Sequence, residues 1–215
     1  MIDTIMELMP QVIEGLMVTL KIFILTLIFS IPLGIIAALG RTSKIKVIEK
    51  ITGLYVLIMR GTPLLLQIVF IFYGLPLMGI IIENRTIAAL IAFVLNYGAY
   101  FAEIFRGGIL SIDRGQYEGA EVLGLSSKDT FMRIILPQAI KNILPPAGNE
   151  IITLVKDTSL VYIVGLNELL KVGKVASNRI GSLFPLLIVG IVYLIIIGIL
   201  TKLLKTVEKR YSYYE

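Results

Sequence analysis

The sequence predicts an all-α protein that crosses a membrane about five times. Of its 215 residues, 57% are hydrophobic and 16% are charged, whereas a soluble domain has about 25% charged residues. The apolar residues form five runs, and each approaches the roughly 20 residues that a helix needs to cross a bilayer. One long interval, 113–135, lacks such a run. We therefore expect residues 1–215 to form a single transmembrane domain with one helical segment outside the membrane.

The predicted spans are 16–39, 54–77, 87–105, 137–163 and 183–203. In the second span, Pro63 should kink the helix, because proline removes a backbone donor and clashes with the preceding turn. Pro145 and Pro146 should bend the fourth span for the same reason. The polar stretch 166–180 is expected to be a helical connector that leads to the fifth span, which is the most uniformly apolar run.

The basic residues predict the orientation of the chain. Thirteen Lys and Arg residues flank the spans on one side and four on the other. Because cytoplasmic loops carry an excess of Lys and Arg, we expect the amino terminus outside and the carboxyl terminus in the cytoplasm. The net charge of +5 then reflects orientation and does not indicate nucleic-acid binding. The richer side holds Arg41, Lys44, Lys46, Lys50, Arg106, Arg114, Lys128, Arg133, Lys141, Lys202, Lys205, Lys209 and Arg210.

The composition also excludes several kinds of chemistry. The chain has no cysteine and no histidine, which rules out thiolate and imidazole metal sites and catalysis by Ser-His-Asp or Cys-His groups. It has no G-x-x-x-x-G-K-[ST] phosphate loop, so we do not expect it to bind ATP through such a loop. We expect no enzymatic activity and no cofactor bound by this chain.

The interval 113–135 is predicted to form two short helices joined by a turn. Residues 116–123 have a helix-compatible composition, and Gly124 suits the left-handed residue that ends a helix. Ser126 and Asp129 then fit a capping box, in which a hydroxyl and a carboxylate satisfy the free amides of a new helix. On the basic side of the membrane, this knob would be accessible to a soluble protein.

These residues resemble the EAA signature of ABC-importer membrane subunits, E-A-A-x3-G-x9-I-x-L-P. The matching positions are Glu118, Ala120, Gly124, Ile134, Leu136 and Pro137. Gly119 replaces the first alanine, which should loosen the helix by roughly 1 kcal/mol. Flanking stretches at 60–65, 73–76, 106–108, 136–139 and 156–160 resemble the polar amino-acid branch of this family, and the likeness covers about 15–204.

The resemblance implies a type I ABC importer fold in which 113–135 forms cytoplasmic coupling helices. The coupling residues that it implies are Glu118, Gly119, Ala120, Gly124, Ser126, Ser127 and Arg133. It also implies two cytoplasmic ATPase subunits that hold ATP and Mg²⁺, an external substrate-binding protein and a polar amino acid as cargo. Five helices are too few to enclose a pathway, so a second permease subunit, identical or different, should complete it.

Polar side chains inside the predicted spans are candidates for the substrate pathway, because they are costly in a membrane. In the fourth span, Glu150, Thr153 and Asp157 share one helix face, with Asn149 and Thr158 beside them. Two acids and a threonine would suit a cavity that holds an ammonium or guanidinium group. Alternatively, the acids pair with lysines or cap broken backbone and hold the bundle together.

The second and third spans contain further polar residues. The third offers a face made of Asn96, Tyr100 and Glu103. An i, i+3 pair between Glu103 and Arg106 is the simplest interpretation of its inner end. Arg60 either snorkels to the interface or pairs with a buried acid. Gln67 either lines the pathway or cross-links helices.

Together these features predict the transmembrane subunit of an ATP-driven importer of polar amino acids, and a basic one if the two acids bind the cargo. One alternative is a passive channel or structural membrane protein that needs no ATPase. Another keeps the fold but carries a different solute, such as methionine or an inorganic ion. The sequence does not decide which amino acid is carried or whether the partner permease is a second copy.

Overall fold

A computed structural model describes residues 2–211, and for residues 2–7 it describes only the backbone. All regular structure in this range is helical. The α-helices are α1 (Ile2–Arg41), α2 (Lys46–Gly61), α3 (Leu64–Val69), α4 (Leu75–Leu77), α5 (Arg85–Leu110), α6 (Arg114–Val122), α7 (Ser127–Asp129), α8 (Leu136–Asp157), α9 (Leu169–Ile180) and α10 (Phe184–Tyr211). Two π-helical turns, Phe70–Gly74 and Thr130–Ile135, join α3 to α4 and α7 to α8, and a 3-10 helix, Thr158–Val164, follows α8.

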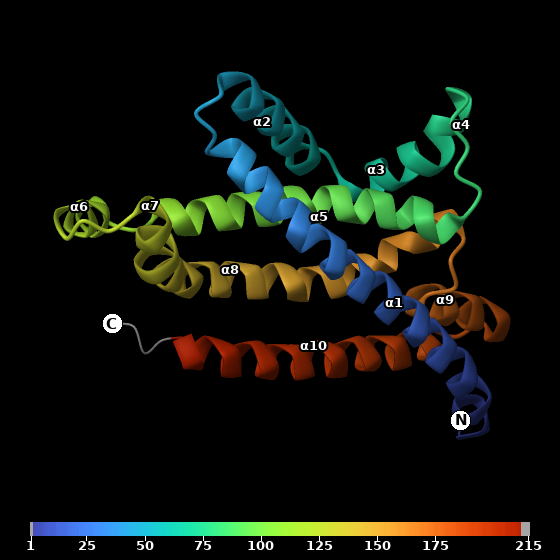
Figure 1. Cartoon of the computed structure of the whole chain (residues 1–215). Helices are drawn as coiled ribbons and strands as arrows, with labels where there is room; N and C mark the ends of the chain where they lie inside the picture. Colours follow the sequence, from blue (N-terminus) through green and yellow to red (C-terminus); the bar gives the residue numbers. More distant parts are fainter. Residues whose placement is uncertain (1, 212–215) are drawn as a thin grey trace.

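Within the described residues, three helices are long and apolar enough to cross a membrane: α1 from Leu8, α5 and α10. The bent pair of α2 with α3–α4 makes a fourth if it counts as one span. Helix α8 carries Lys141, Glu150, Lys156 and Asp157, so its composition alone does not mark it as a span. Nevertheless, α8 packs on both α5 and α10 and runs alongside them in Figure 1.

Helix α5 is the centre of the bundle. Phe93, Tyr97 and Phe101 are each at most 1% exposed, and Figure 1 shows α1 crossing over this helix. Glycines make the crossing close. A Cβ on Gly34 of α1 would lie 2.6 Å from the Cβ of Phe101, and one on Gly98 of α5 would lie 2.7 Å from a Leu33 methyl group. Inside a bilayer the hydrophobic effect does not drive helices together, so close van der Waals packing at small residues holds them against each other.

The second predicted span is not a single kinked helix, and this prediction was wrong in its detail. Helix α2 ends at Gly61 and α3 begins at Leu64, and the two segments are bent by 105°. Thr62 and Pro63 are both extended between them. The residue before a proline avoids the helical region, and the proline itself cannot donate a hydrogen bond. By contrast, α8 accommodates Pro145 and Pro146 and remains one helix from Leu136 to Asp157.

The knob has the local structure that its sequence predicted. Helix α6 is followed by Gly124 in the left-handed conformation, with φ +70°. The Ser126 hydroxyl oxygen accepts a hydrogen bond from the Asp129 amide at 3.1 Å and lies 2.6 Å from the Asp129 carboxylate. The second short helix is not separate, however. After α7 the chain continues through the π-helical turn directly into α8.

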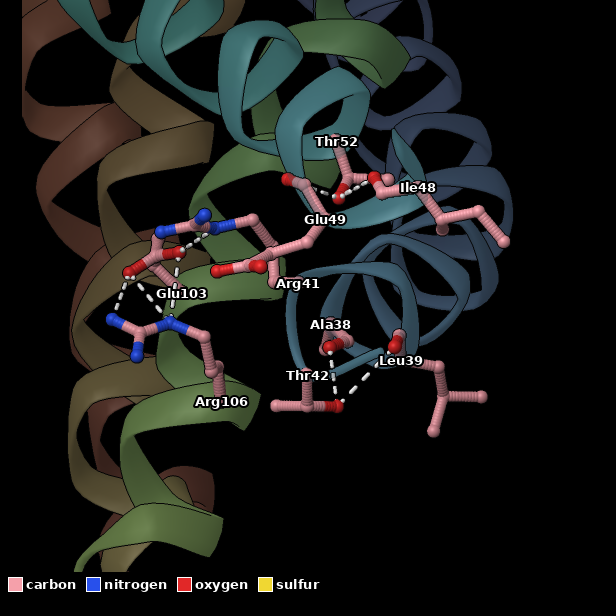
Figure 2. A network of polar contacts seen from close by, with 9 residues as sticks. All are labelled: Ala38, Leu39, Arg41, Thr42, Ile48, Glu49, Thr52, Glu103 and Arg106. Carbon is pink, nitrogen blue, oxygen red and sulfur yellow. Dashed lines mark hydrogen bonds and ion pairs between the residues drawn. The ribbon is translucent and has the colours of Figure 1, made fainter. Parts of the chain in front are cut away.

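An ion-pair network joins the helices where α1 ends (Figure 2). Glu103 of α5 accepts hydrogen bonds from Arg106 at 2.6 Å and from Arg41 of α1 at 3.2 Å. The pair between Glu103 and Arg106 confirms the simplest interpretation of that helix face. The second cation, Arg41, lies 62 positions away in the sequence and fixes the end of α1 against α5.

The loops lie at two opposite ends of the bundle, and these two groups of loops differ in their number of basic residues. Figure 1 shows the turn between α1 and α2, the knob (α6 and α7) and the end of α10 at one end. The start of α1, α4 and α9 lie at the opposite end. The first group contains Arg41, Lys128 and Lys209, whereas the second contains Lys171 and Arg179. Successive connections between the spans thus lie at alternate ends of the bundle, as expected if the chain crosses the membrane back and forth.

The orientation can be tested with single cysteines, because the chain has none of its own. Glu83 and Ser127 are exposed at opposite ends of the bundle. A membrane-impermeant maleimide should label Glu83→Cys in intact cells and Ser127→Cys only in inside-out vesicles, because the excess of basic residues predicts that this end faces the cytoplasm. Reversed labelling would invert the orientation, and equal labelling from both sides would refute the predicted number of crossings.

The ion-pair network should contribute measurably to stability. Glu103→Gln leaves two guanidinium groups without their anion, so we expect a loss of about 1–2 kcal/mol and a lower melting temperature of the detergent-solubilised protein. Arg133→Gln is the matched control. It breaks an Asp129–Arg133 pair whose side chains are 41% and 76% exposed, so the loss should stay below about 1 kcal/mol. Equal effects of the two variants would contradict a structural role for Glu103.

Candidate functional site

A cavity of about 600 Å³ lies where α5 and α8 meet the break after α2. This volume is within the range of small-molecule sites. Five of the predicted pathway residues line it: Asn96, Tyr100, Glu150, Thr153 and Asp157. The remaining lining residues are Arg60, Gly61, Thr62, Pro63, Leu64, Leu65 and Leu160. The break therefore contributes a wall to the same cavity that α5 and α8 supply with polar groups.

A second cavity, of about 670 Å³, lies between α8 and α10 at the end of α10. Its lining includes Lys141, Lys205 and Glu208, and none of the predicted pathway residues reaches it. We take the cavity at the break as the candidate site, because it collects polar side chains from three separate spans in the middle of the bundle.

The two acids of the candidate cavity, Glu150 and Asp157, form no ion pair within 4 Å in the described part of the chain. Asp157 instead accepts a hydrogen bond from the Tyr97 hydroxyl at 2.7 Å. Lys156 is exposed and makes no such pair. The alternative in which lysines neutralise both acids is therefore not the arrangement found.

Arg60 brings a positive charge into the same cavity. Its guanidinium lies over the Tyr100 ring, 5.1 Å from the ring centre, a cation–π contact worth about 0.5–2 kcal/mol. Of the two sequence-based expectations for Arg60, snorkelling or pairing with an acid, the second is met only at longer range: Arg60 interacts electrostatically with Glu150 but forms no ion pair within 4 Å. The cavity consequently has one basic and two acidic side chains in its lining, together with Tyr100, Thr62 and Thr153.

Three of the predicted pathway residues lie outside the cavity lining. Gln67 is a cross-link, since its amide nitrogen donates to the Met59 carbonyl at 2.9 Å and its oxygen accepts from Asn96 at 3.0 Å. Thr158 is buried and donates to the Val155 carbonyl at 2.6 Å. Asn149 is exposed on α8, and its backbone carbonyl accepts from Thr153.

The predicted coupling residues occupy the exposed knob. Glu118, Gly119 and Ser127 are exposed, and a Cβ on Gly119 would meet nothing within 4 Å. Ala120 differs, because it is only 2% exposed and packs inside the protein. Arg133 pairs with Asp129 at 3.1 Å. Sequence analysis did not single out Val122 and Leu123, which are 87% and 76% exposed and give the knob an apolar surface.

Two further polar residues were missed for a physical reason. Tyr97 is 1% exposed and reads as a core aromatic residue, and only the fold brings it to Asp157, 60 positions away. Glu168 is fully buried at the start of α9, where its carboxylate accepts from the Leu170 and Lys171 amides. Burial raises the pKa of Glu168, and these two hydrogen bonds oppose that shift. Glu168 caps a helix and lies outside the cavity lining.

Residues 30–213 match the family described as "Binding-protein-dependent transport system inner membrane component". The chain is 38% identical over 203 residues to an arginine transport system permease protein, ArtQ, of Bacillus subtilis (strain 168), covering 94% of this chain and 92% of the relative. It is 33% identical over 214 residues to a putative glutamine transport system permease protein, GlnP, of Rickettsia conorii, covering 98% of each. A crystal structure of an amino acid ABC transporter with histidines superposes with a TM-score of 0.89 at 35% identity, covering 96% of each chain.

Proposed function

The chain belongs to the family of binding-protein-dependent transport system inner membrane components, and we propose that it carries a basic amino acid through the cavity at the break. The chain is an amino-acid ABC importer permease, and its relatives include one named for arginine transport and one named for glutamine transport. The names differ in cargo, so the choice among amino acids depends on the side chains of this chain.

The charge balance of the cavity supports a basic cargo. Arg60, Glu150 and Asp157 together contribute one positive and two negative charges when ionised. A free amino acid with a cationic side chain brings one carboxylate and two cationic groups, which is the complementary set. A neutral amino acid such as glutamine would leave one of the two acids without a partner, and an unpaired charge in a low-dielectric site is costly.

Each group then has a role. Arg60 binds the cargo carboxylate, and Glu150 and Asp157 bind the ammonium group and the side-chain cation. The Tyr97 hydroxyl donates to one oxygen of Asp157, and Thr153, between the two acids in the sequence, also lines the cavity. An ion pair at 4 Å is worth about 1 kcal/mol in water and about 4 kcal/mol near a protein surface, so exclusion of water by the helices strengthens these contacts.

The helix that carries the acids is tied to the knob. Chain continuity through α7 and the π-helical turn leads directly to α8. Gln138 of α8 donates to Gln116 of α6 at 3.1 Å, and Asn142 of α8 donates to Ser111 at 2.7 Å. A displacement of the knob would therefore move α8 and change the access to Glu150 and Asp157, as expected for a rigid-body switch.

The proposed assembly contains a second permease subunit, two cytoplasmic ATPase subunits and an external substrate-binding protein. The ATPases hold ATP and Mg²⁺, and their closure draws the two knobs together. The exposed apolar residues Val122 and Leu123 support the knob as a docking surface, because such residues on a soluble face mark interaction sites. The amino terminus faces outside and the carboxyl terminus the cytoplasm, in accordance with the distribution of basic residues.

Docking of the knob can be tested at Gly119, where an added Cβ would meet nothing within 4 Å. Gly119→Arg should leave the permease folded but abolish co-purification with the ATPase subunits and the ATP hydrolysis stimulated by the binding protein. Gly119→Ala is the control. It adds one methyl group and should stabilise α6 by roughly 1 kcal/mol while keeping full transport. Normal coupling in the arginine variant would place ATPase docking elsewhere.

The cargo can be tested by neutralising each acid in reconstituted vesicles. Glu150→Gln and Asp157→Asn should each reduce arginine uptake at least about tenfold, the equivalent of 1.4 kcal/mol, while basal ATP hydrolysis persists. Glu49→Gln, at the distant start of α2, should transport normally. If both cavity variants import arginine at the normal rate, or if the unmodified protein prefers glutamine, the cavity acids do not select a basic cargo.

A further inference from the structure

The break between α2 and α3 leaves backbone groups that need partners. The last four carbonyls of any helix have no partner within that helix, and the hydrocarbon core offers no water to replace one. In α2 these carbonyls include those of Ile58 and Met59. The Thr62 hydroxyl donates to the Ile58 carbonyl at 2.8 Å, so the extended residue at the break satisfies the first of them.

Two side-chain amides satisfy the Met59 carbonyl. The nitrogen of Gln67 donates to it at 2.9 Å, and the nitrogen of Asn96 donates to it at 2.8 Å. The Gln67 nitrogen also donates to the Thr62 hydroxyl at 2.8 Å, and the Gln67 oxygen accepts from Asn96 at 3.0 Å. The network joins three separate segments, namely the end of α2, the first turn of α3 and the middle of α5.

The same network lies next to Arg60. Asn96 and Tyr100 are one helical turn apart on α5, so they share one face of it. Asn96 fixes the carbonyl of residue 59, and the Tyr100 ring contacts the guanidinium of residue 60. One residue before Asn96, α5 is also joined to α2 through the Tyr55 hydroxyl, which donates to the Leu95 carbonyl at 2.6 Å.

We infer that Gln67 and Asn96 are positioning residues that keep α2 broken and hold Arg60 in the cavity, and thereby set the affinity of the cavity for its cargo. This inference rests on the proposed function, in which Arg60 binds the cargo carboxylate. Residue 60 directly follows the Met59 carbonyl, which the Gln67 and Asn96 amides hold in place. Loss of these two amides should therefore displace the Arg60 guanidinium. Glu150 and Asp157 should be less affected, because they belong to α8.

The position of residue 60 can be measured without any cargo. Arg60→Cys introduces the single thiol of the chain, and its rate of reaction with a small water-soluble thiol reagent reports whether it faces the cavity. In the assembled transporter, adding Asn96→Leu or Gln67→Met should slow this reaction roughly fivefold or more, the factor that corresponds to about 1 kcal/mol. Thr52→Val is the control, because it removes a side-chain hydrogen bond to the Ile48 carbonyl within α2, far from the break.

The effect on cargo is measured by equilibrium binding of labelled arginine to the transporter without its external binding protein. Gln67→Met, at a residue outside the cavity lining, should raise the dissociation constant about tenfold, while the maximal rate of ATP hydrolysis changes less than about twofold. The exchange variant Gln67→Asn with Asn96→Gln retains both amides and should recover most of the affinity. Thr52→Val should bind like the unmodified protein.

The outcomes separate the two proposals. The positioning role would be overturned if neither Asn96→Leu nor Gln67→Met changed the rate of the thiol reaction at residue 60. Unchanged arginine affinity would also overturn it. An equal fall in stability and ATP hydrolysis at unchanged affinity would also overturn it, because it indicates a structural role alone. If the unmodified transporter binds no arginine, the proposed cargo is wrong. The reaction rates at residue 60 would then still show whether Gln67 and Asn96 hold α2 and α3 in the broken arrangement.

Discussion

Backbone hydrogen bonding in a water-free medium is the constraint on which this structure depends. Pro63 removes one donor and forces the residue before it out of the helix, so the second span cannot continue as one helix. A broken helix within a bilayer survives only where other groups satisfy its ends. Here Thr62, Gln67 and Asn96 supply them. The break is thus stable, and its extended residues are available to line a cavity.

The charged residues inside the bundle fall into two groups that differ in their partners. Glu103 is held between Arg41 and Arg106 (Figure 2) and joins α1 to α5. Glu150 and Asp157 have no ion-pair partner among the described residues and face a cavity with Arg60. Charged side chains in a membrane are expensive, so the first group is explained by stability alone. The second group requires something further, and the basic cargo that we propose would supply it.

Helix α8 connects the knob with the candidate cavity, the two regions for which we propose a function. Its first turns follow the knob without interruption and are bonded to it through Gln138, while Asn142 bonds to Ser111 at the end of α5. Its last turns present Glu150, Thr153 and Asp157 to the cavity. Pro145 and Pro146 lie between these regions, yet the helix stays continuous. A mechanical signal from the knob can therefore reach the cavity through a single helix, whereas the break of the second span gives the opposite wall a separate support.

The sequence by itself determined the features that depend on local patterns. Apolar runs, the left-handed Gly124, the cap at Ser126 and the i, i+3 pair of Glu103 with Arg106 all follow from neighbours within a few residues. The shared face of Glu150, Thr153 and Asp157 follows in the same way from helical spacing. Only the tertiary structure decided which of these groups meet. Tyr97 reaches Asp157 across 60 positions, Arg41 reaches Glu103 across 62, and Asn96 reaches the Met59 carbonyl across 37. Such contacts have no period in the sequence, because they depend on where separate helices cross. The sequence likewise predicted only a kink at Pro63, whereas the tertiary structure has a break there with a cavity beside it.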